Sequence, residues 1–182
     1  MATRSFLFLL GSSRADGNTE ALARLAAEQL PAGSQQRWLH LRDLPLPDFE
    51  DLRHADGGHP APEGPAATLL EATLAATDVV IASPLYWYAV STSTKRYLDH
   101  WSGWLEAPGI DFEQRMAGKT LWGVTALADD DPAVAEPLAG TLRASAQYLR
   151  MRWGGVLLGN GSKPGDVLSD SAAVSRAAAF FS

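Results

Sequence analysis

Residues 11–19, Gly-Ser-Ser-Arg-Ala-Asp-Gly-Asn-Thr, bring hydrogen-bond donors together beside an expected helix. Side chains with hydroxyl, guanidinium or amide donors stand at Ser12, Ser13, Arg14, Asn18 and Thr19. Gly17 lets the backbone turn tightly and approach a ligand closely. An apolar run precedes the stretch and helical periodicity follows it, so a helix beginning near Asn18 would point its positive end toward these donors. Such a strand-loop-helix unit can hold a phosphate group.

Residues 11–19 match none of the stricter phosphate-binding motifs, and the same residue types could simply cap a helix. A P-loop needs a lysine after its second glycine, where this chain has Asn18, and a dinucleotide fingerprint needs three glycines, where it has only Gly11 and Gly17. A phosphatase loop with a cysteine nucleophile is excluded because the chain contains no cysteine. An ordinary turn with Asn18 or Thr19 as the helix cap needs the same residue types, so this stretch alone does not decide between capping and binding. A phosphate here would be bound rather than transferred.

Residues 83–88, Ser-Pro-Leu-Tyr-Trp-Tyr, follow another apolar run that predicts a buried strand. Three adjacent aromatic side chains on a loop cannot all point into the core. Aromatic faces and backbone N–H groups suit a flat heterocycle, although the same residues could serve a core or an oligomer interface. Paired with residues 11–19, they favour one ligand with a phosphate at one end and a planar ring system at the other.

Strands and helices are expected to alternate along the chain. Strands are predicted at 6–10, 36–41, 78–83, 119–126 and 156–158, and helices at 18–30, 66–77, after Lys95, at 137–150 and at 170–181. Residues 42–65 and 107–118 are predicted loops, and Gly154 and Gly155 are expected to end the fourth helix. The alternation predicts an α/β fold with a doubly wound five-stranded parallel sheet. With the strand order 2-1-3-4-5, the loops after the first and third strands flank the ligand crevice.

The composition indicates one soluble globular domain, residues 1–182, that is 46% hydrophobic and 20% charged. The net charge of −6 argues against a nucleic-acid partner, and no apolar stretch is long enough for a membrane span or a secretory signal. The lack of cysteine excludes cysteine-ligated zinc and iron–sulfur clusters, and it suits a reducing compartment, so a cytoplasmic location is expected. His54 and His59 lie among acidic residues, but their spacing matches no metal signature, so we expect a polar loop without a metal.

The two motifs, taken with Lys95 and Asp99, resemble those of the flavodoxin-like NAD(P)H-dependent FMN reductases and quinone reductases over nearly the whole chain. The resemblance implies that the phosphate of FMN is held by Ser12, Arg14, Gly17, Asn18 and Thr19 and that the isoalloxazine ring is lined by Pro84, Leu85, Tyr86 and Trp87. Lys95 and Asp99 match the helix pattern of the family and are expected to be structural. The family's third flavin loop is rich in glycine, but residues 125–129 here are Thr-Ala-Leu-Ala-Asp.

The resemblance also implies an activity, with the flavin rather than a catalytic side chain carrying the chemistry. NAD(P)H would deliver hydride to flavin N5, and a quinone, a free flavin or another small acceptor would then take up the electrons. Two alternatives fit the same motifs: a flavodoxin-type carrier that passes single electrons to protein partners, and an FMN-binding protein without turnover.

Aromatic residues after the second motif suggest a homodimer. Tyr97, Trp101 and Trp104 share one face of the expected helix, while Leu98 and Leu105 contribute to a second apolar face. Two apolar faces on one short helix exceed what the sheet can cover, so we expect part of this surface to form an interface that completes the flavin pocket. In the alternative, Trp104 packs beneath the loop at 42–65 of its own chain.

Overall fold

A five-stranded parallel sheet in the order β2-β1-β3-β4-β5 forms the centre of the computed structural model, which describes residues 3–182. This is the strand order predicted from the sequence. The elements in chain order are β1 (Ser5–Leu10), α1 (Asn18–Ala27), β2 (Gln35–His40), α2 (Gly64–Ala75), β3 (Asp78–Ala82), α3 (Thr92–Glu106), α4 (Phe112–Met116), β4 (Thr120–Leu127), the 3-10 helix η1 (Pro132–Ala135), α5 (Glu136–Tyr148), β5 (Arg152–Asn160), the 3-10 helix η2 (Asp166–Ser169) and α6 (Ser171–Ala177). None of the helices within residues 3–182 has the length and apolar character needed to cross a bilayer.

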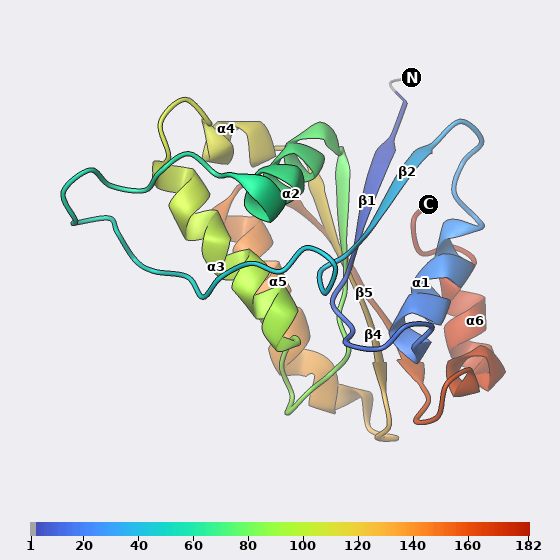
Figure 1. Cartoon of the computed structure of the whole chain (residues 1–182). Coiled ribbons are helices and arrows are strands. Elements are labelled where there is room, and N and C mark those ends of the chain that lie inside the picture. Colours follow the sequence, from blue (N-terminus) through green and yellow to red (C-terminus); the bar gives the residue numbers. More distant parts are fainter. Residues whose placement is uncertain (1–2) are drawn as a thin grey trace.

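Helices cover both faces of the sheet and divide the core into two layers. α1 and α6 lie on one face, and α2, α3 and α5 lie on the other (Figure 1). Along β1, Phe8 faces α1 and α6 while Leu7 and Leu9 face the opposite layer, and all three are buried. Because both faces are buried, the strand is a continuous apolar run rather than an alternating one.

β5 begins at Arg152, so the prediction that Gly154 and Gly155 end a helix is wrong. Both glycines lie inside the strand, next to a register shift between Leu121 and Trp122 of β4. A Cβ atom on Gly154 would overlap the Trp122 ring, and Gly155 has a positive φ of 107°. The glycines therefore accommodate a large side chain at a β-bulge.

The predicted loop at 107–118 contains α4, because Phe112 and Met116 lie one helical turn apart and are both buried in the core. α1 and α6 end earlier than predicted, at Ala27 and Ala177. After α6 the chain continues in turns that bring the buried Phe181 ring against Phe6, Phe8 and Trp122.

The aromatic face of α3 is covered within the chain. Tyr97, Trp101 and Trp104 are each no more than 5% exposed and pack edge-to-face on one another or on Phe112. The long loop contributes to the cover, since its His59 is buried, stacks on Phe49 and lies beside Gly103 of α3. Trp104 is thus buried within its own chain, as in the alternative, but against Tyr97 and Phe112, and the aromatic face of α3 is not free to form the dimer interface that the spacing predicted.

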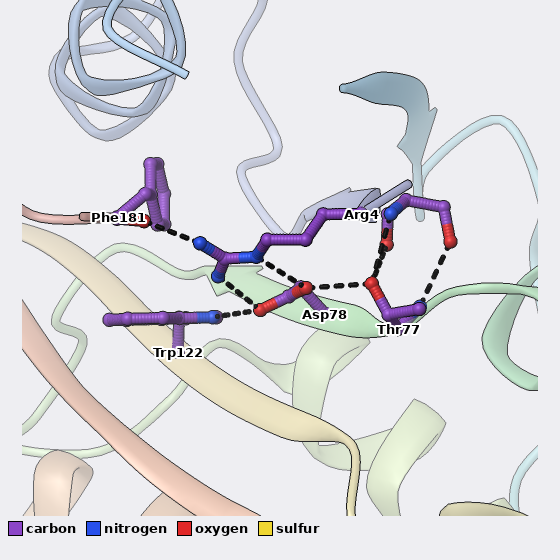
Figure 2. A network of polar contacts seen from close by, with 6 residues as sticks. Arg4, Thr77, Asp78, Trp122 and Phe181 are labelled. Atoms are coloured by element: carbon purple, nitrogen blue, oxygen red, sulfur yellow. Dashed lines mark hydrogen bonds and ion pairs between the residues drawn. The ribbon is translucent and has the colours of Figure 1, made fainter. Parts of the chain in front are cut away.

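Asp78 joins the amino ends of the central strands to the end of the chain (Figure 2). Its buried carboxylate accepts hydrogen bonds from the Arg4 guanidinium at 2.6 and 3.2 Å, from Trp122 Nε1 at 2.9 Å and from Thr77 Oγ1 at 2.7 Å. Arg4 also donates to the Phe181 carbonyl at 2.7 Å. Burial alone would raise the pKa of Asp78, but the hydrogen bonds from Arg4, Trp122 and Thr77 and the charge of Arg4 outweigh it and lower that pKa.

Replacing Asp78 with Asn should lower the free energy of unfolding at pH 7 by about 2 kcal/mol, because hydrogen bonds to a charged group contribute about 1.5–3 kcal/mol. Folding lowers the pKa of Asp78, so its stabilisation is present above the ordinary carboxyl pKa and is lost as pH falls through the lowered value. Urea unfolding from pH 7 down to about pH 3 should show the difference between wild type and Asp78→Asn shrinking.

Asp43→Asn is the matched control, because Asp43 pairs with Arg42 on an exposed surface and its loss should change stability little. An Asp78→Asn variant as stable as wild type at pH 7 would contradict this account of the network.

Candidate flavin site

The loops after β1, β3 and β4 start from neighbouring points at the carboxyl edge of the sheet. The Gly11 N–H donates to the Ala82 carbonyl at 2.9 Å, and the Ser83 N–H donates to the Val124 carbonyl at 3.0 Å. Since ligands of doubly wound sheets bind beyond this edge, the structure brings both motif loops to the position that the strand order predicts.

The amino end of α3 fastens the first motif loop to the second. Ser91 Oγ and Ser93 Oγ donate to the Gly11 carbonyl at 2.7 and 3.0 Å, and the Ser91 N–H donates to Ser83 Oγ at 2.9 Å. Ser91 also caps α3 by accepting from the Thr94 N–H. These two serines were not predicted from the sequence, where their only signal is a Ser-Thr-Ser-Thr run before a helix.

α1 begins at Asn18 as predicted, but neither Asn18 nor Thr19 caps it. The cap residue is Gly17, in extended backbone and without a side-chain cap hydrogen bond. The Asn18 side chain instead binds residues 163–167, and Thr19 Oγ1 accepts from the Ala126 N–H at 3.3 Å. The first N–H groups of α1 therefore keep their capacity to donate to an anion, which fits a phosphate group.

Ser12 and Arg14 complete the loop before this helix. Ser12 is buried, and its Oγ accepts from the Arg14 N–H at 3.1 Å, which shapes the turn. The Arg14 side chain is exposed and belongs to no ion pair within residues 3–182. A guanidinium without a carboxylate partner can pair with a phosphate.

The aromatic motif forms a tight turn whose tip points into solvent. Tyr86 and Ala89 exchange backbone hydrogen bonds of 3.0 and 3.1 Å, and Trp87 and Tyr88 between them have positive φ values of 49° and 63°. Trp87 is 93% exposed, and Tyr88 and Tyr86 are also exposed. Bulky residues rarely adopt this backbone conformation, and strain of this kind gathers at ligand sites.

The aromatic turn faces the loop after β4 across a hollow of about 220 Å³. Its walls come from the two loops and from η1, namely Leu85, Trp87, Tyr88, Leu127, Ala128, Asp129 and Val134. Pro84 is partly buried and, like Tyr86, does not line the hollow itself. Residues 127–129, which depart from the glycine-rich pattern, thus lie where a flat ring would have to fit.

Two of the groups with shifted pKa values, Tyr97 and Lys119, lie in the core and at the amino edge of the sheet. Burial raises the pKa of Tyr97 in the core, and burial lowers the pKa of Lys119 at the amino edge of β4. The Lys119 ammonium donates to the Ala76 and Leu74 carbonyls, so its role is to tie the end of α2 to β4.

Gly11→Ala should destabilise the protein by about 1–3 kcal/mol, because a Cβ atom at this position would overlap Thr94 Oγ1 and crowd Ser91 Oγ. Urea unfolding measures the change. Gly140→Ala in α5 is the control, since its Cβ atom would have no neighbour closer than 4.0 Å and alanine favours a helix. Adding Thr94→Ala to Gly11→Ala should restore part of the loss, and a Gly11→Ala variant as stable as wild type would refute the tight junction.

Tyr88→Asn should stabilise the ligand-free protein by about 0.5–1 kcal/mol, because asparagine tolerates positive φ better than tyrosine. Tyr148→Asn makes the same chemical change at an exposed tyrosine outside the positive-φ region and should not stabilise. Thermal melting of both variants without ligand decides the matter, and a loss of stability in Tyr88→Asn would count against a strained turn.

Comparison with known proteins agrees with this geometry. The family model described as NADPH-dependent FMN reductase matches residues 5–149. The protein YwqN of Bacillus subtilis (strain 168), named as an NAD(P)H-dependent FMN-containing oxidoreductase, is 33% identical over 169 residues, which cover 92% of this chain and 91% of YwqN.

Solved structures share the whole fold. The Trp repressor binding protein from Bacillus subtilis has a TM-score of 0.77 at 25% identity, with 97% of each chain covered. The NAD(P)H:quinone oxidoreductase from Methanothermobacter marburgensis has a TM-score of 0.71 at 15% identity, covering 97% of this chain and 94% of that one, and so shows the fold alone. The flavodoxin-like fold, the family resemblance, FMN as the cofactor and NAD(P)H as the co-substrate are thereby confirmed. The chain belongs to the NADPH-dependent FMN reductase family and is an oxidoreductase.

Proposed function

We propose that this protein is an FMN-dependent oxidoreductase that transfers hydride from NAD(P)H to a quinone, a flavin or another small acceptor. The observation that carries the proposal is that two complementary features lie at the carboxyl edge of the sheet: a helix amino end without a side-chain cap and an aromatic-walled hollow. FMN has a terminal phosphate and a flat ring to match these ends, and it supplies the hydride-accepting group. The relationship to YwqN supports the same activity.

The proposed phosphate contacts combine backbone and side-chain donors. The first N–H groups of α1, at Asn18 and Thr19, point along the helix axis with its positive dipole end. Thr19 Oγ1 accepts from Ala126, which leaves its own O–H free to donate to the phosphate. Ser12 and Arg14 lie on the turn that precedes α1, and we assign their hydroxyl and guanidinium groups as further donors to the phosphate.

The proposed ring contacts come from the loop after β3. Leu85 and Trp87 present apolar and aromatic surface to the hollow, while Pro84 and Tyr86 set the path of the chain on either side of Leu85. The Tyr86–Ala89 turn keeps the Trp87 ring in solvent, so one side of the hollow stays open. An open side would let NAD(P)H and the acceptor use the same position in turn, as ping-pong transfer requires.

A homodimer and a cytoplasmic location are further parts of this proposal. Since the aromatic face of α3 is buried, the support for a dimer is now the exposed turn of Tyr86, Trp87 and Tyr88, because aromatic residues are enriched in interface cores. A cysteine-free chain suits a reducing compartment. Residues 1–182 would form a single FMN-binding domain.

The test is a titration of the purified protein with FMN and with FAD, followed by anaerobic addition of NADH or NADPH. FMN should bind more tightly than FAD, because a helix amino end suits a terminal phosphate better than a diphosphate that must continue outward. The visible flavin absorbance should then bleach with either NADH or NADPH and return when a quinone is added.

Other outcomes favour the alternatives. Tight FMN binding without reduction by NAD(P)H would indicate a flavodoxin-type carrier or a non-catalytic FMN-binding protein. Tighter binding of FAD, or no flavin binding at all, would contradict the proposed site.

A further inference from the structure

The loop between β5 and η2, residues 161–165, is fastened to the first residue of α1. Asn18 Nδ2 donates to the Lys163 carbonyl at 2.8 Å, and the Gly165 N–H donates to Asn18 Oδ1 at 2.9 Å. A Cβ atom on Gly161 would lie 3.0 Å from Asn18 Nδ2 and 2.7 Å from the Val167 nitrogen, so glycine permits this close approach. Asn18, which the resemblance assigns to the phosphate site, thus uses its side chain to hold a second loop.

This contact places the loop beside the proposed phosphate position. α1 and α6 run side by side on one face of the sheet, and the connection from β5 reaches η2 near the amino end of α1 (Figure 1). Lys163 is exposed, so its long side chain is free to swing toward the first turn of α1.

Arg14 and Lys163 are cations of this region that take part in no ion pair within residues 3–182. By contrast, Arg24 pairs with Glu20 further along α1. The carboxylate of Asp166, the first residue of η2, accepts from the N–H groups of Ser162 and Lys163 at 3.3 and 2.7 Å. The Asp166 carboxylate is therefore bonded to backbone N–H groups, and the Lys163 ammonium forms no ion pair within residues 3–182.

We propose that Lys163 is a second cationic ligand of the FMN phosphate, opposite Arg14, and that Asn18 is the positioning residue that holds it there. The inference rests on the proposed binding of FMN at the amino end of α1. A phosphate monoester carries about −1.5 to −2 charges at pH 7, more than one arginine neutralises. In a protein with a net charge of −6, a second local cation also counters the unfavourable overall field.

The test compares dissociation constants of FMN and of riboflavin, which has the same ring but no phosphate. Lys163→Gln should weaken FMN binding about fivefold, the equivalent of an exposed ion pair, and leave riboflavin binding unchanged. Arg14→Gln should behave in the same way, and Lys163→Arg should retain FMN affinity. Raising the salt concentration should reduce the effect of Lys163→Gln, because screening weakens the ion pair.

The matched control is Arg152→Gln, which removes the same charge from an exposed arginine at the amino end of β5 that forms no ion pair within residues 3–182. It should leave both flavin affinities unchanged. Asn18→Ala should weaken FMN binding in the wild-type background but add little when Lys163 is already Gln, since Asn18 acts through Lys163.

The results separate this inference from the proposed function. If wild type fails to bind FMN, the proposed site itself is wrong. If wild type binds FMN and Lys163→Gln binds it equally well, or loses riboflavin affinity to the same extent, Lys163 is not a phosphate ligand. An equal effect of Arg152→Gln would replace the local contact with a general effect of net charge.

Discussion

The hydrogen bonds that the Gly11 carbonyl accepts from Ser91 and Ser93 are the junction on which the site depends. They join the first motif loop to the amino end of α3, across 80 and 82 residues of sequence. Without them, the helix end that would face a phosphate and the turn that would face a ring could move independently. The buried Thr94 leaves no room for a side chain at position 11, so only glycine lets the first motif loop lie this close to α3.

The sheet also holds the backbone conformations of the loops after β1 and β3. Gly17 leaves α1 without a side-chain cap, and Trp87 and Tyr88 occupy a conformation that costs about 1–3 kcal/mol per residue. The uncapped helix end and the positive-φ turn are each unfavourable in isolation. The first presents backbone N–H groups, and the second presents aromatic side chains, beyond the carboxyl edge of the sheet. The buried strands and the Asp78 network at the opposite edge stabilise the domain that carries them.

Much of the fold could be predicted from the sequence, because buried parallel strands such as 78–82 are continuous apolar runs between helical patterns. The positions of the two motif loops at the carboxyl edge of the sheet followed from the predicted strand order 2-1-3-4-5. The tie from Ser91 to Gly11 could not be predicted, since it joins distant segments. The partners of the Asn18 side chain could not be predicted for the same reason, because they lie beyond residue 160.

Two further errors have local causes. A pair of glycines usually ends a helix, but Gly154 accommodates Trp122 in a strand, which only the three-dimensional packing shows. The surplus apolar face of α3 was assigned to a partner because two apolar faces on one short helix exceed what the sheet alone can cover. In the structure, Phe49 and the buried His59 of the loop at 42–65 lie against Gly103 of α3, and Trp104 packs on Tyr97 and Phe112 of its own chain.

The most direct test of the account is a crystal structure of the protein with FMN. Larger cavities exist than the hollow at the aromatic turn, including one of about 520 Å³ beneath the long loop, lined by prolines, Phe49 and Trp104. The account predicts the phosphate within hydrogen-bond distance of the N–H groups of Asn18 and Thr19, and the ring between the loops after β3 and β4. FMN bound beneath the long loop, or with its phosphate away from α1, would contradict it.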